Sequence, residues 1–360
     1  MNIGKFLMES SNLFTVYRWN NNPAIVRFSE SDNIFNNLLL ILFVFSSEPK
    51  ETLIKILHNK IYEAIPKIIL SDISLATKSK IEEKGKDLWE EVIKKTYQEL
   101  KSKIDKNISK KLLIQYTFDE ETEKKIKMIN LLATQKEASI NERVFPEYYN
   151  EPKKRNQEKI ESINIDNKEE IEKIAKDLFE ISIKLVTMIR WNKNHRNIKS
   201  SVASHSFFVF LTSYILALLS DLDSDTIYEI MVASILHDLP EAFTGDVISP
   251  TKRKVSGLEE IIGEVEKDFV KEWYIDKDVI SKKIQKYEKY IYYPFDQNYG
   301  GFVKTADLIG ALVESSLEIS TGNQNSYFKD TFSSIKREIL RISPIDVSQI
   351  ISEIESTILL

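Results

Sequence analysis

The chain has 360 residues, of which 42% are hydrophobic and 29% charged, a composition typical of a globular protein rather than a disordered one. Its net charge is −5 with acidic and basic residues interleaved, which disfavours a protein that coats nucleic acid or lies on a membrane surface. It contains no cysteine, so disulfides, thiolate metal sites and cysteine nucleophiles are excluded.

Helix-forming residues dominate the chain, and helix breakers are rare. Only nine Gly and nine Pro occur, and alternating strand patterns with hairpin turns are hard to find. The sequence therefore predicts an all-α fold. The two most apolar runs, 38–45 and 207–219, are shorter than the roughly 20 residues of a membrane span, so both predict buried helices. No export signal is visible, and we expect a cytoplasmic protein without a membrane partner.

Three blocks of the first half recur in the second half in the same order. The motif Arg-Trp-Asn at 18–20 recurs at 190–192, in each case before a polar loop and an apolar run. Two further pairs of blocks follow in register, at 64–78 with 238–252 and at 118–130 with 295–307. Leu/Ile/Lys-rich helices resemble one another by chance, but that does not account for the shared Arg-Trp-Asn. The pattern indicates an internal duplication.

The duplication divides the chain into two units. Residues 1–145 form the first unit, the polar, Pro-containing segment 146–167 is predicted to be a linker, and residues 168–360 form the second unit. Asp166 or Asn167 can cap the helix that opens the second unit. The further helices of this unit are predicted at 206–220, 224–238, 256–273, 278–290, 301–320, 325–341 and 346–359.

Two histidines and two aspartates of the second unit stand on three of these apolar helices. His205 lies at the start of one helix, the pair His237-Asp238 ends the next, and Asp307 lies inside a third. A lone histidine in such a place is more often a cap or a satisfied core group. A carboxylate in an apolar helix, however, requires a partner of positive charge. Together the four side chains make a complete nitrogen and oxygen ligand set for one divalent ion.

This order of ligands resembles the H…HD…D signature of the HD-domain phosphohydrolases, a helical, metal-dependent superfamily. The segment 237–241 (HDLPE), Thr-Gly-Asp at 244–246, Pro250, and Arg190-Trp191 before His205 are similar to the bacterial 5′-deoxynucleotidases of the YfbR type. The resemblance covers about residues 170–320. Those nucleotidases are about half the length of this chain and lack its first unit. A glycine-rich HD-GYP signature is missing, which disfavours a cyclic-di-GMP hydrolase. Ala242 replaces the aspartate expected after glutamate in (p)ppGpp hydrolases.

The resemblance implies the release of phosphate from deoxyribonucleoside 5′-monophosphates with the help of one divalent ion, which could be Mn, Co, Fe, Mg or Zn. It implies four ligands for that ion, namely His205, His237, Asp238 and Asp307. The substrate would then be a small nucleotide, and nucleic acid is disfavoured because no basic stripe is visible. The base, the sugar and the physiological metal are left open.

The resemblance also implies roles for the residues around the metal. Arg190 would hold the phosphate, which suits the geometry of a guanidinium group. Glu241 would position or activate the attacking water, and Asp246 would assist the leaving 5′-oxygen or the sugar. Trp191 would shape the sugar pocket, and Lys252 would add positive charge. The structural alternatives are that Trp191 belongs to the core, that Lys252 is a solvated loop residue, and that Arg190 pairs with Asp246.

The first unit has lost every ligand position. The repeat places Asn33 at the position of His205, Glu63-Ala64 at His237-Asp238, Lys67 at Glu241 and Asn130 at Asp307, whereas Arg18, Trp19 and Asp72 are kept. We therefore expect a degenerate HD-like domain without hydrolase activity. Because HD nucleotidases commonly form homodimers, the two units are expected to pair as an intrachain pseudo-dimer, and further homo-oligomerisation is left open.

Two other functions are compatible with the sequence. The protein could be a nucleotide-binding regulatory or scaffold protein in which the first unit binds a ligand and the second is vestigial. The complete ligand set, together with Glu241, argues against a vestigial site. An HD phosphodiesterase or nuclease is the other alternative, and the acidic composition makes a nuclease the weaker of these.

Overall fold

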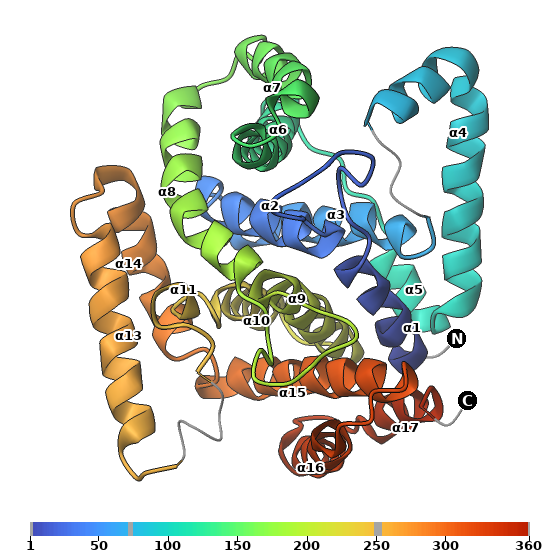
Figure 1. The fold of residues 1–360 in the computed structure, drawn as a ribbon, viewed down its shortest axis with the longest axis vertical. Coiled ribbons are helices and arrows are strands. Elements are labelled where there is room, and N and C mark those ends of the chain that lie inside the picture. Colours follow the sequence, from blue (N-terminus) through green and yellow to red (C-terminus); the bar gives the residue numbers. More distant parts are fainter. Residues whose placement is uncertain (1–2, 71–74, 248–253, 359–360) are drawn as a thin grey trace.

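The fold is all-α, as the composition predicts. The computed structural model of the chain describes residues 3–70, 75–247 and 254–358 (Figure 1). Helices account for most of the described residues, and no β-strand occurs among them. Two isolated bridges, Tyr17 with Ser29 and Ile189 with Ser201, are the β-type pairings found there.

The helices of the first half begin at residues that satisfy their free backbone N–H groups. Ser29 and Asp32 form a reciprocal capping box on α2, and the Asp119 side chain caps α6. The elements in chain order are α1 (Ile3–Ser10), η1 (Ser11–Phe14), α2 (Glu30–Val44), α3 (Lys50–Ala64), η2 (Ile65–Ile68), α4 (Leu75–Lys103), α5 (Lys106–Leu112), α6 (Glu120–Glu142) and α7 (Pro146–Glu161).

The helices of the second half begin and end within about one helical turn of their predicted ends. Ser201 caps the helix that carries His205, and Asp223 caps the helix that ends at the His-Asp pair. The elements are α8 (Lys168–Thr187), α9 (Val202–Leu219), α10 (Ser224–Leu236), α11 (Glu241–Thr244), α13 (Leu258–Tyr274), α14 (Asp278–Tyr292), α15 (Gln297–Ser320), α16 (Ser326–Ile342) and α17 (Ser348–Ser356).

The segment predicted as a linker differs from the expectation, because most of it is helix α7. Pro146 is the first residue of this helix. A proline is tolerated there because a backbone N–H at this position would have no partner within the helix. The helix packs along α6, and the buried Tyr149 donates a hydrogen bond to the carbonyl of Pro23, with the oxygens 3.0 Å apart. The polar composition of this segment does not predict a packed helix, because only a few of its side chains are buried. Residues 162–167 are left as the connection.

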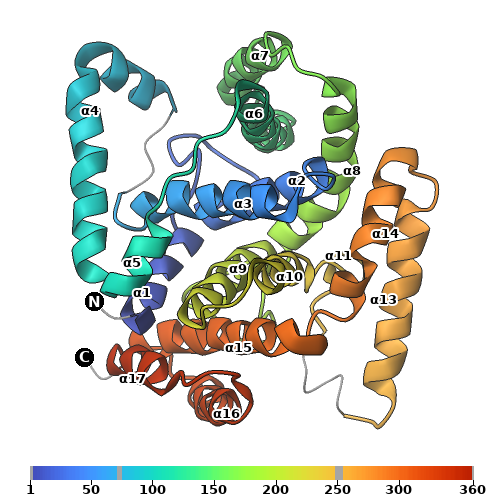
Figure 2. The ribbon, with the colours of Figure 1, turned by 180° about the vertical axis from the view of Figure 1, so that it is seen from behind.

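The core of the molecule lies where α2 and α3 meet α9 and α10. Around this centre, α6 and α7 lie opposite α15 and α16, and α4 lies opposite α13 and α14 (Figures 1 and 2). The helix α9 is long and apolar enough to cross a membrane, but 89% of it is buried inside the fold. Its apolar surface is therefore accounted for by core packing.

The two halves share unusual local structures at the positions that the sequence repeat pairs. Trp19 and Trp191 both have left-handed backbones, with φ of 56° and 58°, which is rare for a bulky residue. Both isolated bridges connect the residue before an Arg-Trp pair to the serine that caps the next helix. The loop between them therefore has the same course in each half.

The two ends of the chain lie side by side (Figure 1). The backbone N–H of Gly4 in α1 donates to the Glu353 carboxylate in α17, with the atoms 2.7 Å apart. A Cβ atom on Gly4 would lie only 2.3 Å from the carbonyl oxygen of Ile350. Glycine is therefore required at this crossing of the first and last helices.

Candidate metal centre

The helix α9 brings His205 into the interior through a well-defined first turn. The Ser201 side chain accepts a hydrogen bond from the Ser204 backbone N–H, at 2.9 Å, which fixes the start of the helix. His205 follows in this turn and is fully buried. Its ring lies against α15 at Gly310, where a Cβ atom would approach the Cε1 atom to 2.9 Å. The imidazole therefore depends on a glycine in the facing helix.

The pair His237-Asp238 stands where α10 ends. His237 Nδ1 lies 2.8 Å from the carbonyl oxygen of Ser234, which can only accept a hydrogen bond. Nδ1 therefore carries a proton, and Nε2 presents its lone pair whenever the ring is neutral. Nε2 lies 3.1 Å from Asp238 Oδ2, yet among the described residues neither atom has a hydrogen-bond partner. Two buried acceptors that face each other fit a cation between them.

Asp307 joins this pair from α15. Its Oδ1 atom lies 3.1 Å from His205 Nε2, and its Oδ2 atom accepts from Lys304 Nζ at 2.8 Å. His205 Nε2 also lies 4.0 Å from Asp238 Oδ2. The structure thus gathers all four predicted ligands from three helices into one place.

The four side chains form a site that fits a metal ion. One ligand atom each from His205, His237 and Asp238 lie within 4.8 Å of one another, and Asp307 is in contact with the first of them. Imidazole nitrogen with carboxylate oxygen is the donor set of catalytic divalent ions. The convergence of these nitrogen and oxygen atoms, two of which make no hydrogen bond among the described residues, favours a metal over a purely structural network.

The charges of the site favour ionised carboxylates. Burial raises the pKa of Asp238, but His237, His205 and Arg190 outweigh it and bring the pKa to about 2. The pKa of Asp307 is also held below its usual value, because Lys304 and His205 outweigh burial. Both carboxylates therefore carry their charge at neutral pH, as metal ligands must.

A buried carboxylate behind the metal centre holds the Arg-Trp pair. Glu314 of α15 accepts from the indole N–H of Trp191, with Oε2 2.9 Å from Nε1, and lies 3.3 Å from Arg190 Nε. Burial would raise the pKa of Glu314, but Arg190, Arg196 and His205 bring it to about 2. Glu314 is therefore ionised although it is buried.

The pairing of Arg190 differs from the structural alternative considered for it. Its Nη1 atom lies 3.7 Å from Asp238 Oδ2, so its ion pairs are with Glu314 and a candidate ligand rather than with Asp246. The charges of Asp246 and Glu241 still contribute to raising the pKa of Arg190. Arg190 consequently stands between a structural carboxylate and the metal centre.

Glu241 and Asp246 follow the His-Asp pair in the chain. Glu241 begins the short helix α11, one turn after the His-Asp pair, and Asp246 follows Gly245, whose φ is 83°. Both side chains are half-buried. Lys252 lies outside the described residues, as do Pro250 and Asp72.

Several residues of the site were missed in the sequence. Arg196 binds Glu318 and Ser200, Lys304 binds Asp307, and Gly310 faces His205. Glu314 and Glu318 stand one turn apart in the same apolar helix as Asp307. Like Asp307, both are carboxylates in an apolar helix, and each needs a partner of positive charge.

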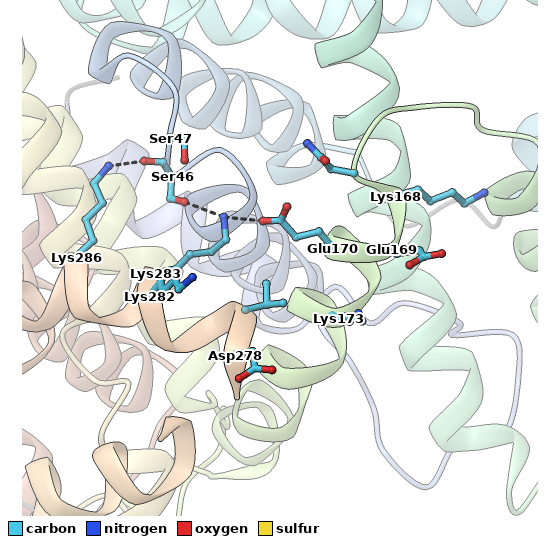
Figure 3. Close-up of a pocket in the computed structure, with 12 residues that line it drawn as sticks. Ser46, Ser47, Lys168, Glu169, Glu170, Lys173, Asp278, Lys282, Lys283 and Lys286 are labelled. Atoms are coloured by element: carbon cyan, nitrogen blue, oxygen red, sulfur yellow. Dashed lines mark hydrogen bonds and ion pairs between the residues drawn. The ribbon is translucent and has the colours of Figure 1, made fainter. Parts of the chain in front are cut away.

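A separate groove of about 900 Å³ lies where the end of α2 meets the first turns of α8 and α14 (Figure 3). Five lysines and three carboxylates line it. Lys283 Nζ lies 3.1 Å from Glu170 and 3.2 Å from the Ser46 hydroxyl, and Lys286 donates to the Ser46 carbonyl. Only Lys283 among these lysines forms an ion pair in the described part of the chain, and none of the predicted site residues lines the groove.

Two solved structures are similar to part of the chain. One is an HD-domain phosphohydrolase (lin2634) from Listeria innocua, at 20% identity and a TM-score of 0.40, and the other is the PH0347 protein from Pyrococcus horikoshii OT3, at 19% and 0.36. Each similarity covers 51% of this chain and 98% of the other. No curated protein matches the chain.

A family match covers the part of the chain that holds the site. Residues 177–358 match the family described as 5′-deoxynucleotidase YfbR-like. This range is just over half of the chain and includes the Arg-Trp pair, the four clustered ligands and Glu314. The chain therefore belongs to the YfbR-like 5′-deoxynucleotidase family and is a metal-dependent phosphohydrolase.

Proposed function

We propose that the protein removes the 5′-phosphate from deoxyribo- or ribonucleoside monophosphates. One divalent ion, Mn, Co, Fe, Mg or Zn, would be held by His205, His237, Asp238 and Asp307. The observation that carries this proposal is that one ligand atom each of His205, His237 and Asp238 lie within 4.8 Å of one another, inside the range that matches the family. When bound, such an ion lowers the pKa of a water molecule and neutralises phosphate charge.

Arg190 is the proposed phosphate-binding residue. Glu314 binds its Nε edge, and its Nη1 atom points toward the metal centre, 3.7 Å from Asp238. The guanidinium is therefore held by Glu314 at its Nε side, while Nη1 on its other side faces the metal centre. This arrangement suits bidentate binding of a phosphate beside a metal ion.

The other residues around the metal centre have proposed roles in the reaction or in substrate binding. Glu241 would accept a proton from the attacking water, whose oxygen bonds to phosphorus as the bond to the 5′-oxygen breaks. Asp246 would assist the departing 5′-oxygen or bind the sugar. Trp191 would shape the sugar pocket from its strained turn, and Lys252 would add positive charge.

A phosphate-release screen tests the proposal. Protein loaded separately with each of the five metals is incubated with a panel of nucleoside 5′-monophosphates, 3′-monophosphates and cyclic or linear diesters. We expect release from 5′-monophosphates with at least one metal, and a loss of more than about a hundredfold in Asp238→Ala, because a metal ligand is removed. Glu63→Ala, at the first-half position that the repeat matches to the neighbouring His237, is the control and should retain full activity.

The screen also separates the alternative functions. Release from diesters alone would identify a phosphodiesterase or nuclease instead. Saturable nucleotide binding without hydrolysis would favour a regulatory or scaffold protein. Absence of release from every monophosphate by metal-loaded protein would overturn the proposal.

We further propose that the first half is a degenerate HD-like domain, and that the two halves pair as a pseudo-dimer. Reciprocal contacts across the centre support this. Ser29 contacts Ser204 with the hydroxyl oxygens 3.1 Å apart, and the residues matched to these two, Ser201 and Asp32, also form a hydrogen bond. Reciprocity of this kind defines an isologous interface between two copies.

A second reciprocal pair lies at the edge of the same interface. Lys111 of α5 donates to the carbonyl of Leu218 at 2.9 Å, and Lys286 of α14 donates to the carbonyl of Ser46. In each case the lysine of one half binds a carbonyl at the C-terminal end of the central helix of the other, α9 or α2. The helix α7 packs on α6 as α16 packs on α15, which favours a boundary after Glu161.

Engineered cysteines test this pairing, because the chain has no natural cysteine. Ser29→Cys with Ser204→Cys should form a disulfide within one chain, since the two hydroxyls are already in contact. Non-reducing mass measurement should give a single chain of 41.9 kDa. A disulfide-linked dimer of two chains would contradict the intrachain interface. The cytoplasmic location stays a prediction, testable by fractionation.

A further inference from the structure

The Arg-Trp pair of the first half is held in the same manner as that of the second half. Arg18 Nε lies 2.9 Å from Glu137 Oε2, and the Trp19 indole N–H donates to the same oxygen at 2.9 Å. Glu137 is fully buried in α6, as Glu314 is in α15. The inner side of the arginine is therefore alike in both halves.

The outer side of the arginine differs between the halves. Arg18 Nη1 donates to Glu30 Oε1 at 3.0 Å, and Lys67 Nζ binds the other oxygen of Glu30 at 2.6 Å. Glu30 is only 3% exposed. A carboxylate thus bridges Arg18 and a second cation, as two oxygens of a phosphate would. The pKa of Glu30 is lowered because Arg18 and Lys67 outweigh its burial.

The residue that matches Glu30 in the second half is Val202. Each is the first residue of its helix, α2 or α9. The Glu30 N–H binds the carbonyl of Val16 at 2.9 Å, and the Val202 N–H binds the carbonyl of Met188 at 3.0 Å. Both carbonyls stand two residues before the arginine. The backbones therefore correspond, but valine brings no anion to Arg190.

A second internal charge lies where the metal ligands would be. Lys60 Nζ is 2.7 Å from Glu63 Oε2 and 2.7 Å from Asn130 Oδ1. The sequence repeat pairs these two acceptors with His237 and Asp307, which lie at the metal centre of the second half. The Lys60 side chain is only 6% exposed. An ammonium group therefore stands between two positions that correspond to metal ligands.

We propose that the first half is a self-occupied copy of the active site. The Lys60 ammonium takes the place of the metal ion, and the Glu30 carboxylate takes the place of the substrate phosphate. This inference rests on the proposed function of the second half, where Arg190 binds phosphate. It explains why Arg18, Trp19 and Glu137 are present in a half that has no metal ligands, because Glu30 within the same chain neutralises Arg18.

The inference makes Val202 the residue that keeps Arg190 available to substrate. A carboxylate at this position would bind the outer nitrogens of Arg190 and compete with the phosphate. Conversely, removing the Glu30 charge would leave Arg18 and Lys67 around an anion-sized position in the first half. An ordinary buried ion pair predicts neither effect, because removing one partner would then only destabilise the fold.

Phosphate binding to the first half provides the primary test. The background is Arg190→Gln without metal, so that the second half has lost both of its proposed phosphate contacts. In this background Glu30→Gln should bind about one inorganic phosphate per chain, measured by calorimetry and by a phosphate-dependent rise in Tm. Adding Arg18→Gln should abolish the binding. Absence of binding in folded Glu30→Gln protein, or binding that survives loss of Arg18, overturns the inference.

Substitution of Val202 provides the second test, in the active half. Val202→Glu should lower kcat/KM by about tenfold or more while the metal content stays at the wild-type level, because the new carboxylate occupies Arg190. Val202→Gln, of the same size without charge, should lose much less. Equal losses in both variants would contradict the inference. If wild-type protein releases no phosphate from any nucleotide, the proposed function fails, and the calorimetric test still decides this inference.

Discussion

Trp191 donates its indole N–H to Glu314, with Nε1 2.9 Å from Oε2, while its own backbone stands in the left-handed region at a φ of 58°. That conformation costs a bulky residue roughly 1–2 kcal/mol. The hydrogen bond to Glu314 offsets part of this conformational energy and holds Trp191 at the start of the loop that follows. Because Arg190 Nε lies 3.3 Å from the same carboxylate oxygen, one buried group orients both members of the pair.

Removing the charge of Glu314 should therefore affect both stability and substrate binding. Glu314→Gln keeps the shape but leaves Arg190 and Arg196 without their shared anion. We expect a loss of about 3–5 kcal/mol in the free energy of unfolding, as for other broken buried pairs. We also expect kcat/KM to fall by about tenfold or more, because Arg190 is no longer fixed. Denaturant unfolding and nucleotide kinetics measure the two effects.

The first half supplies the matched control. Glu137→Gln removes the corresponding carboxylate from Arg18 and Trp19. It should lower stability but leave kcat/KM unchanged, because the proposed chemistry takes place in the second half. If the two variants lose activity equally, Glu314 acts only through global stability and its positioning role is contradicted.

Replacing Gly310 by alanine should be harmful, although helix propensity alone predicts that the replacement stabilises the protein. Alanine in place of glycine inside a helix usually adds about 1 kcal/mol of stability. At Gly310, however, the new Cβ atom would lie 2.9 Å from His205 Cε1. We expect Gly310→Ala to displace the imidazole and lower metal affinity by about tenfold or more, measured by chelator competition. Gly263→Ala in α13 has open space around it and should be stabilising with unchanged metal affinity.

The sequence was sufficient to predict which four candidate ligands lie close together. His205, His237 and Asp238 with Asp307 were predicted because imidazoles and carboxylates on apolar helices need a common partner, and the structure brings the four together. The boundaries of α9 and α10 were also accessible, since capping serine and aspartate residues mark their starts.

Other features depend on contacts that one sequence does not display. The hydrogen bond from Trp191 to Glu314 joins residues that are distant in the chain, and nothing local marks a left-handed tryptophan. The role of Gly310 follows only from the distance between α9 and α15. The helix α7 was assigned to a linker because its stability comes from packing on α6 rather than from an apolar stripe.

The central interface yields a prediction about pH. Asp32 is buried between the halves and accepts hydrogen bonds from Ser29, Ser201 and Ser204. Burial raises its pKa above the value of 3.8, and these hydrogen bonds only partly oppose the shift. A carboxyl group with a raised folded-state pKa contributes stability that is present below about pH 3.8 and is lost as the pH rises through the folded value.

The Asp32→Asn variant lacks this titration, so the comparison with wild type should depend on pH. Asparagine loses one acceptor for Ser29, which lowers Tm by an amount that does not change with pH. In addition to this constant offset, the wild type should lose stability as the pH rises from about 3 to 7. The Tm of the variant minus the Tm of the wild type should therefore increase over this range. Thermal unfolding at several pH values measures it.

Asp119→Asn is the control with the opposite sign. Asp119 is exposed and caps α6, and its hydrogen bonds from the backbone and side chain of Thr122 lower its pKa. Its contribution is present above the unfolded pKa and is lost as the pH falls, so the control variant should compare worse with wild type as the pH rises. Asp32→Asn and Asp119→Asn should therefore diverge. Parallel pH profiles would show that the Asp32 carboxylate is not strained by burial, and that the interface between the halves admits water.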